Sequence, residues 1–313
     1  MPDHALRAAD RAAAAAGLGT AVVVLTAGFA LIGVGVAGAG GAVAGIAVAV
    51  VLTAVVYVCC DRLALSAMGA RPVSEVEQPE LYRLVRELSK AGRLPVPRLF
   101  MSPAEQPNSF TVGRGPRTAA VCCTEGLLRV LDEAELRGVL GHELAHVSGH
   151  DILAASMSAG LATVITFPAG LVRYARSRSR SRSRRRDGAP VSRSGSGSGS
   201  GSGLGVAESL LMLVFGPIAA VLVRLAVSPE REYRADAMAA LLTGDPVALS
   251  SALRKADAGA AKLPLTPDGR RLSVGHLMLV GPFRPEGVAR LFGTHPPAAE
   301  RVRRLEALAG YRR

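Results

Sequence analysis

The feature that most limits the fold of this chain is a long apolar run near its N-terminus. No charged residue occurs from Ala12 to Cys60, and one transmembrane helix needs about 20 residues. The run is therefore long enough for two spans, and the glycine-rich stretch 38–41 near its middle can form a turn. We expect a transmembrane hairpin with helices at 18–37 and 42–58. The alternative is a cleaved signal peptide, whose apolar region of about 7–15 residues is much shorter.

The composition is consistent with helices that face lipid. Hydrophobic residues make up 49% of the 313 residues, whereas aromatic residues make up 4% and tryptophan is absent. The formal net charge of +12 is typical of proteins that bind nucleic acid or an anionic membrane surface. The cysteines form two adjacent pairs, 59–60 and 122–123, without C-x-x-C spacing. We interpret them as small apolar residues in a reducing setting.

Two further apolar segments interrupt the rest of the chain. Residues 152–172 are uncharged and long enough to span a membrane, although Pro168 is expected to kink the helix. Residues 204–227 form a fourth, weaker segment. Between them, 173–203 contains nine arginines and then alternates Ser with Gly. Such low complexity cannot form a core.

The Arg-Ser run within 173–203 resembles RNA-binding tails, and this alternative has to be weighed. Only one aromatic residue, Tyr174, is interleaved with the arginines, and apolar segments flank the run on both sides. Proteins that bind single-stranded nucleic acid usually stack bases on several aromatic side chains. We therefore expect a solvated loop at the membrane surface and no specific nucleic-acid partner.

Basic residues on both flanks of the first hairpin predict its orientation. Arg7 and Arg11 precede it, and Arg62 and Arg71 follow it, so the positive-inside rule places both flanks in the cytoplasm. The part of the chain that follows the hairpin then faces the cytoplasm. If the third and fourth apolar segments also cross, the Arg-rich loop lies outside, against the same rule. Length favours a crossing by 152–172, whereas charge opposes it, and we expect a multi-pass protein of the cell membrane.

The sequence HELAH is the strongest chemical signal. Asp132 can cap a helix and Glu135 stands three residues later, as in a capping box, so the motif is predicted to lie on a helix. On that helix His142 and His146 share one face, where two imidazoles can bind one Zn²⁺. Glu143 can take a proton from water beside the metal. The alternative is a surface helix with two solvated histidines, which so specific a motif disfavours.

A third ligand is needed from elsewhere in the chain. Glu232 lies far beyond His146, at the start of a predicted second helix, and a glutamate so placed is the usual third protein ligand of such sites. Asp236 shares its face and can hold the free ring nitrogen of a ligating histidine. The alternative is a charged surface helix on which Arg231 and Arg234 pair locally.

Four motifs along the chain resemble one family. They are PNSFTVGR, HELAH, EYRAD after an apolar segment, and THPPAAER near the C-terminus. Together with the N-terminal hairpin they resemble the HtpX family of membrane metalloproteases, gluzincins related to the CaaX prenyl proteases, over nearly the whole chain. The resemblance implies one zinc ion per chain, held by His142, His146 and Glu232. It also implies that Glu143 is the general base and that Asp236 orients a ligating histidine.

The expected fold is therefore mainly α with a small antiparallel β-sheet, in which multi-pass membrane helices are joined to a gluzincin-type zinc metalloprotease domain. An amphipathic helix is predicted within 72–92, and strands are predicted at 98–101, 106–113 and 118–124, the last two as a hairpin. The expected order begins with a cytoplasmic tail (1–11), a transmembrane hairpin (12–60) and the first part of the protease domain (61–151). A third apolar segment (152–172), a disordered loop (173–203) and a fourth apolar segment (204–227) follow. The second part of the protease domain (228–313) comes last.

The resemblance also implies roles for two residues near the C-terminus. His295, in GTHPP, is expected near the active site, where it can donate to the substrate carbonyl or its oxyanion. It can equally well cap the helix that follows from Ala298. Arg301 matches a basic residue near the metal-bound glutamate.

Substrates and partners are predicted from the strand before the zinc helix. An edge strand beside the metal can hold an extended peptide by strand addition, here through Asn108, Ser109 and Phe110. Ser109 stands where the family more often has Ala. Recognition of the backbone suits broad cleavage of misfolded or membrane proteins, and the resemblance implies quality control of membrane proteins in the lipid bilayer. The rival hypothesis is a membrane-anchored binding protein whose Arg-rich loop holds anionic lipid or RNA. The sequence makes no prediction of the oligomeric state.

Overall fold

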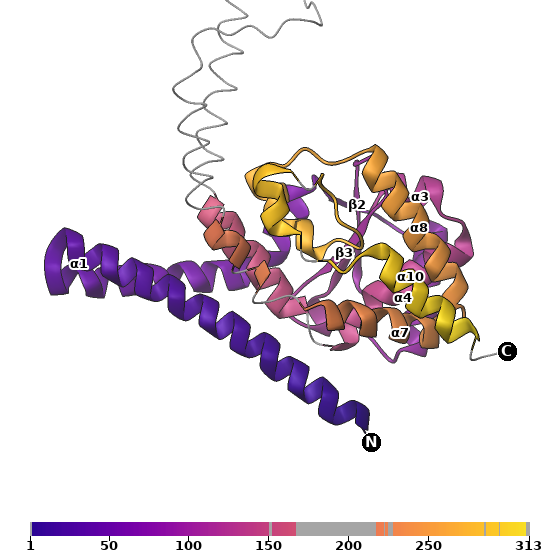
Figure 1. The fold of residues 1–313 in the computed structure, drawn as a ribbon, viewed down its shortest axis with the longest axis horizontal. Helices are drawn as coiled ribbons and strands as arrows, with labels where there is room; N and C mark the ends of the chain where they lie inside the picture. The colour runs from indigo at the N-terminus through magenta and orange to yellow at the C-terminus, as the bar shows by residue number, and fades with distance from the viewer. Residues whose placement is uncertain are drawn as a thin grey trace, which may run out of the picture.

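The structure is a computed structural model, and it describes residues 2–149, 152–166, 217–221, 223–224, 228–284, 286–293 and 295–310. The predicted kink at Pro168, the Arg-rich and Gly-Ser loop at 173–203 and most of the fourth apolar segment lie outside these residues. The described part consists of a long N-terminal hairpin joined to a domain in which helices pack on a small sheet (Figure 1).

The hairpin turns where the glycine-rich stretch predicts a turn. Helix α1 (Pro2–Ala67) is interrupted at Ala37 (φ −146°, ψ 30°) and Gly38 (φ 60°, ψ −143°), and the positive φ is one that glycine adopts readily. The chain then folds back on itself (Figure 1). The two halves are in close contact, since a Cβ on Gly33 would lie 2.0 Å from the carbonyl oxygen of Gly41.

The outer surface of the hairpin is apolar. Val36 is 82% exposed and Leu31 is 72% exposed. Among the described residues one helix, Ala15–Ala67, is long and apolar enough to cross a membrane. A shorter apolar helix, Ile152–Thr166, packs on the second half of the hairpin, because a Cβ on Gly160 would lie 2.6 Å from the side chain of Val56. Crossing by the third and fourth apolar segments stays a prediction.

The sheet is mixed, so the prediction of an antiparallel sheet is wrong for one pair. Its strands are arranged in the order β1-β2-β4-β3, with β1 at Arg71–Pro72, β2 at Arg98–Ser102, β3 at Ser109–Val112 and β4 at Ala120–Thr124. The predicted hairpin of β3 and β4 is present, but β2 and β4 run parallel. Strand β1 was not predicted.

The parallel pair results from the connection between β2 and β3. This connection passes over the end of β4, where the hydroxyl of Thr124 donates to the carbonyl of Gln106 (2.7 Å) and accepts from the amide of Asn108 (2.9 Å). Strand β3 therefore does not pair with β2, and β4 lies between them and pairs with both. The residue pattern within a strand does not specify which strands it pairs with.

Both faces of the sheet are covered, and β4 shows how. Val121 and Cys123 point to a core shared with helices α2 (Pro79–Ala91) and α4 (Glu133–Gly149). Ala120 and Cys122 point to the opposite face, where the end of α1 packs, as expected from the alternation of side chains along a strand. All four cysteines are free, and three are fully buried, which fits their interpretation as small apolar residues.

The remaining helices are α3 (Glu125–Val130), α7 (Pro229–Thr243), α8 (Pro246–Lys262), α9 (Gly269–Val274) and α10 (Ala298–Gly310), with 3₁₀ turns at Pro116–Thr118, Gly275–Leu277 and Gly287–Phe292. Of these helices, α7 and α8 pack on α4, α10 packs on α7 and α8, and α9 packs on α1. Glycines allow the close approach: a Cβ on Gly138 would lie 3.0 Å from the backbone of Leu249 on α8, and one on Gly141 would lie 3.1 Å from Thr243 on α7.

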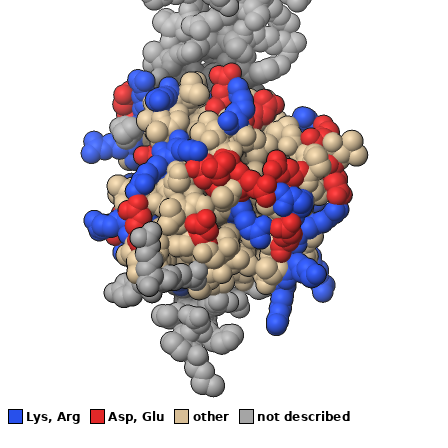
Figure 2. Space-filling model, turned by 90° about the vertical axis from the view of Figure 1, so that its right-hand side faces the viewer, with Lys and Arg blue, Asp and Glu red and all other residues tan. Residues whose placement is uncertain are grey.

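The face of this domain that points away from the hairpin is covered by interleaved acidic and basic side chains (Figure 2). Ion pairs join separate helices of the domain, with Arg137 of α4 2.6 Å from Glu87 of α2 and Lys255 of α8 2.7 Å from Glu135 of α4. Such a surface is suited to water, whereas the exposed surface of α1 is suited to lipid.

We predict that Gly33→Val destabilises the protein by about 1–3 kcal/mol, the usual cost of overpacking, because any side chain at this position meets the backbone of Gly41. Gly35→Val is the matched control, since no atom lies within 4 Å of its Cβ position. Thermal unfolding of the two variants in detergent checks this. Equal midpoints would show that the two halves of α1 are not in contact.

Candidate metal centre

Helix α4 places two imidazoles side by side. The capping box predicted at its start is present: the amide of Glu135 donates to Asp132 Oδ1 (2.9 Å), and the amide of Asp132 donates to Glu135 Oε2 (3.0 Å). Within the helix, the Nε2 atoms of His142 and His146 are 3.1 Å apart and their rings are perpendicular. Both nitrogens therefore point to a common place.

Helix α7 brings a carboxylate to the same place. Glu232 Oε2 lies 3.6 Å from His142 Nε2, and Glu232 Oε1 lies 3.7 Å from His146 Nε2. The ligand atoms of the three residues all lie within 4.8 Å of one another. The helices approach closely enough because Gly141 has no side chain to push α7 away.

The three side chains fit a cation. Glu232 Oε2 is buried and accepts no hydrogen bond from the described residues, although Arg301 Nη1 lies 3.7 Å away, and a buried carboxylate oxygen without a hydrogen bond is costly. Burial raises the pKa of Glu232, but His146, His142 and Arg301 outweigh this effect and lower the pKa to about 2. Two imidazole nitrogens and a carboxylate are a donor set typical of catalytic zinc.

Asp236 and Arg301 orient the first of these histidines. Asp236 Oδ1 lies 3.0 Å from His142 Nδ1, which favours a proton on Nδ1 and leaves the lone pair of Nε2 directed to the metal position. The guanidinium of Arg301 donates two hydrogen bonds of 2.7 Å to Asp236 and lies 3.7 Å from Glu232. Burial raises the pKa of Asp236, but Arg301 outweighs this effect and holds the pKa well below its usual range.

Glu143 is held by the sheet. Its side chain is buried, and its two carboxylate oxygens accept hydrogen bonds of 2.6 Å from the hydroxyls of Ser109 and Thr111 on β3. Burial raises the pKa of Glu143, against the lowering effects of His142 and the two hydroxyls. Ser109 and Thr111 share a face of β3 because side chains alternate along a strand. That period is the signal by which Thr111, absent from the sequence prediction, could have been found.

The proposed peptide-binding residues do not lie on an open strand edge. Asn108, Ser109 and Phe110 are buried, because the segment 278–280 covers the edge of β3. The amide of Leu279 donates to the carbonyl of Ser109 (2.9 Å), Phe110 is paired with residue 278, and the Asn108 amide donates to the carbonyl of residue 280 (3.0 Å). The expected open edge is therefore wrong for this structure, because a segment distant in sequence occupies it.

The space beside the metal ligands is small. A cavity of ≈ 30 Å³, room for about one water molecule, is lined by His146, Glu232, Thr111, Ile152, Ala155, Arg231, His276 and Leu277. His276 was not predicted from the sequence. It is buried, its Nε2 lies 3.0 Å from the hydroxyl of Ser158, and burial lowers its pKa to about 4.

His295 lies in the segment before α10, close enough for the charge of Glu232 to act on it. Burial lowers the pKa of His295, against the raising effect of Glu232. Its Nε2 is 3.1 Å from the carbonyl of Gly275, and its Nδ1 is buried without a hydrogen-bond partner among the described residues.

Comparisons with known proteins agree with this site. Residues 75–309 match peptidase family M48. A protease HtpX homolog of Kineococcus radiotolerans is 51% identical over 251 residues, which cover 80% of each chain. Those of Paenarthrobacter aurescens and Pseudarthrobacter chlorophenolicus are 44% and 41% identical, and the matches cover 82% and 95% of each chain.

The site combines two histidines of α4 with Glu232 of α7, and Glu143 of α4 lies beside them. This arrangement is typical of metallopeptidases. The chain belongs to peptidase family M48 and is a metalloprotease similar to the HtpX homologs. The predicted family and enzyme class are confirmed, and the rival hypothesis of a non-catalytic binding protein is not favoured.

We predict that Thr111→Val lowers kcat by about tenfold, with KM and metal content unchanged, because one of the two charge-assisted hydrogen bonds that orient Glu143 is lost. Thr111→Ser, which keeps a hydroxyl, should retain most of the activity. Steady-state kinetics with metal analysis of each variant checks this. An equal loss in both variants would mean that packing of the methyl group, not the hydroxyl, is what matters.

Proposed function

We propose that this protein is a zinc-dependent endopeptidase of the cell membrane that cleaves misfolded or membrane proteins at its cytoplasmic side. The observation that carries the proposal is the buried cluster of His142, His146 and Glu232 beside Glu143, within a chain that belongs to an M48 peptidase family. Zinc is proposed because its preferred donors are the ones present.

The chain's own residues divide the chemistry among them. Zinc held by His142, His146 and Glu232 supplies a Lewis acid, which lowers the pKa of water and polarises a carbonyl. Glu143 takes the proton of the attacking water and passes it to the leaving amine, with its carboxylate aligned by the hydroxyls from β3. His295 Nε2 donates to the carbonyl of Gly275, so donation from Nδ1 to the developing oxyanion requires the imidazolium form, in which both ring nitrogens carry protons.

A peptide substrate requires part of the structure to open. The cavity of ≈ 30 Å³ holds about one water molecule, so no peptide reaches Glu143 in this state. Strand addition to β3 at Asn108–Phe110 requires that residues 278–280 leave the strand edge. The alternative route is displacement of helix Ile152–Thr166, which supplies Ile152 and Ala155 to the cavity wall.

Membrane substrates are proposed from the position of that same helix. It lines the catalytic cavity through Ile152 and packs on the apolar hairpin through Gly160, close to Val56. The catalytic cavity therefore lies beside the segment proposed to enter the bilayer. Polypeptides that emerge from the membrane would reach the site first, which supports a role in membrane-protein quality control.

We predict that Glu143→Gln abolishes proteolysis while the protein keeps its fold and zinc, because the amide cannot accept a proton but can still hydrogen-bond both hydroxyls. The matched variant, Glu232→Gln, should lose zinc, since its carboxylate is a proposed ligand. Cleavage of an unfolded membrane protein, together with metal analysis, checks both. Residual wild-type activity in Glu143→Gln would exclude this residue as the base.

A further prediction concerns the multi-pass topology. If the third and fourth apolar segments cross the membrane, a cysteine at Ser196 lies outside the cell and reacts with an impermeant maleimide in intact cells, in a variant without the native cysteines. A cysteine at Arg93, between α2 and β2, is the cytoplasmic control and reacts only after lysis. Protection of the cysteine at position 196 until lysis would contradict the four-span model and leave the two spans of the first hairpin as the membrane anchor.

A further inference from the structure

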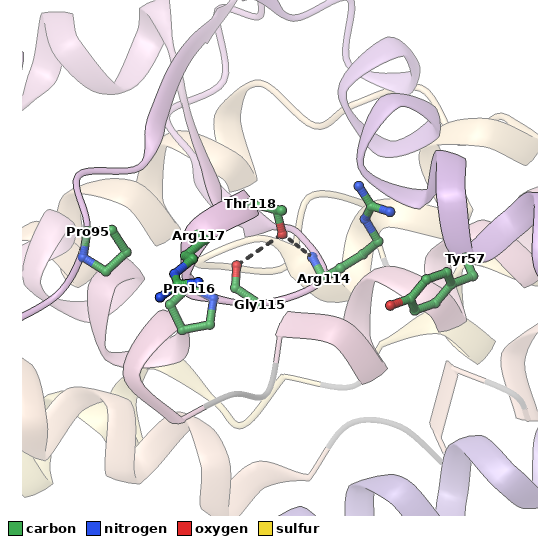
Figure 3. A pocket seen from close by; sticks show the side chains of 7 residues that line it. All are labelled: Tyr57, Pro95, Arg114, Gly115, Pro116, Arg117 and Thr118. Carbon is green, nitrogen blue, oxygen red and sulfur yellow. Dashed lines mark hydrogen bonds between the residues drawn. The ribbon is translucent and has the colours of Figure 1, made fainter.

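A second pocket lies between the hairpin and the catalytic domain, away from the metal centre. It has a volume of ≈ 670 Å³ and is lined by Tyr57 of α1, Pro95, and residues 114–118 of the loop between β3 and β4 (Figure 3). Two of the lining side chains, Arg114 and Arg117, are cationic. None of the residues in this pocket takes part in the proposed reaction.

Arg114 has an unsatisfied donor in this pocket. Its Nε is buried and has no hydrogen-bond partner among the residues that the structure describes, and its guanidinium lies 5.6 Å from the centre of the Tyr57 ring. Within the described part of the chain, neither Arg114 nor Arg117 has an ion pair. Asp61, on the adjoining end of α1, is already bound by Arg98, at 2.8 Å. The pocket thus has two cationic side chains without a described counter-charge.

The loop presents these arginines in a fixed conformation. The hydroxyl of Thr118 accepts from the amide of Arg114 (3.0 Å) and donates to the carbonyl of Gly115 (3.1 Å), as the dashed lines of Figure 3 show. The amide of Thr118 also donates to the carbonyl of Gly115 (3.0 Å). A loop held in this way loses little conformational entropy when it binds a ligand.

The pocket lies at the end of the apolar run. Tyr57 is about half exposed, and the first charged residues after the run, Asp61 and Arg62, follow one helical turn later. Tyrosine is enriched where a membrane meets water, and basic pockets at that level bind lipid headgroups. With α1 in the bilayer, as proposed above, Arg114 and Arg117 lie at the depth of the phosphates.

We propose that this pocket binds the phosphate group of an anionic phospholipid. Arg114 donates from the terminal nitrogens of its guanidinium to a phosphate oxygen, in the charge-assisted geometry that guanidinium groups favour, and Arg117 adds a second positive charge to the pocket. Pro95 and Pro116 provide apolar walls for the glycerol and the upper acyl chains. The bound lipid would join the hairpin to the loop after β3, the strand that holds Glu143.

Native mass spectrometry of the full-length protein in detergent tests the proposal. With equimolar phosphatidylglycerol and phosphatidylcholine, the wild type should retain one phosphatidylglycerol preferentially. The double variant Arg114→Gln/Arg117→Gln should retain it at least about tenfold less, the loss expected for one or more charge-assisted hydrogen bonds. The matched control is Arg129→Gln, an exposed arginine of α3 whose guanidinium contacts only the carbonyl of Glu125 among the described residues.

Other results would overturn the proposal. Equal retention of phosphatidylglycerol by the double variant and the wild type would show that the pocket is not the lipid site. Binding of inorganic phosphate that depends on Arg114, without retention of lipid, would assign the pocket to a free anion. Cleavage of a substrate in detergent by the double variant should match the wild type, which shows that it folds. Its outcome is independent of the Glu143→Gln test, so the two proposals fail separately.

Discussion

The buried guanidinium of Arg301 is the interaction on which the site depends. The side chain is 1% exposed, and it joins α10 to Asp236 of α7 and to the carbonyl of Leu279 (2.6 Å), while Asp236 in turn accepts from the ring of His142 on α4. A charge so deeply buried is tolerated only with full pairing. The same contacts that satisfy Arg301 therefore position Asp236, His142 and the segment that covers β3.

The hairpin and the catalytic domain meet through a small number of close contacts. Gly160 allows helix Ile152–Thr166 to approach Val56 on α1, and the end of α1 covers one face of the sheet through Ala64 and Leu65. The opposite face supports α4 and the metal ligands. The end of the hairpin and β3, whose hydroxyls hold Glu143, therefore belong to one packed core.

Local patterns in the sequence predicted much of the fold. The hairpin turn at Gly38, the capping box of Asp132 and Glu135, and the shared face of His142 and His146 all depend on residues within about one or two turns of each other. The strands β2, β3 and β4 were predicted for the same reason. Their preferences come from backbone sterics and side-chain period, which a short stretch of sequence contains in full.

By itself the sequence determined the apolar hairpin, the zinc-type motif and the family, because these are properties of composition and spacing. Only the tertiary structure decided that β2 and β4 run parallel, that residues 278–280 cover the edge of β3, and that Thr111 bonds to Glu143. It also decided how small the space beside the ligands is. Each of these features arises where segments distant in sequence meet, and burial and hydrogen-bond satisfaction across the whole fold select the partners. No local period carries that information.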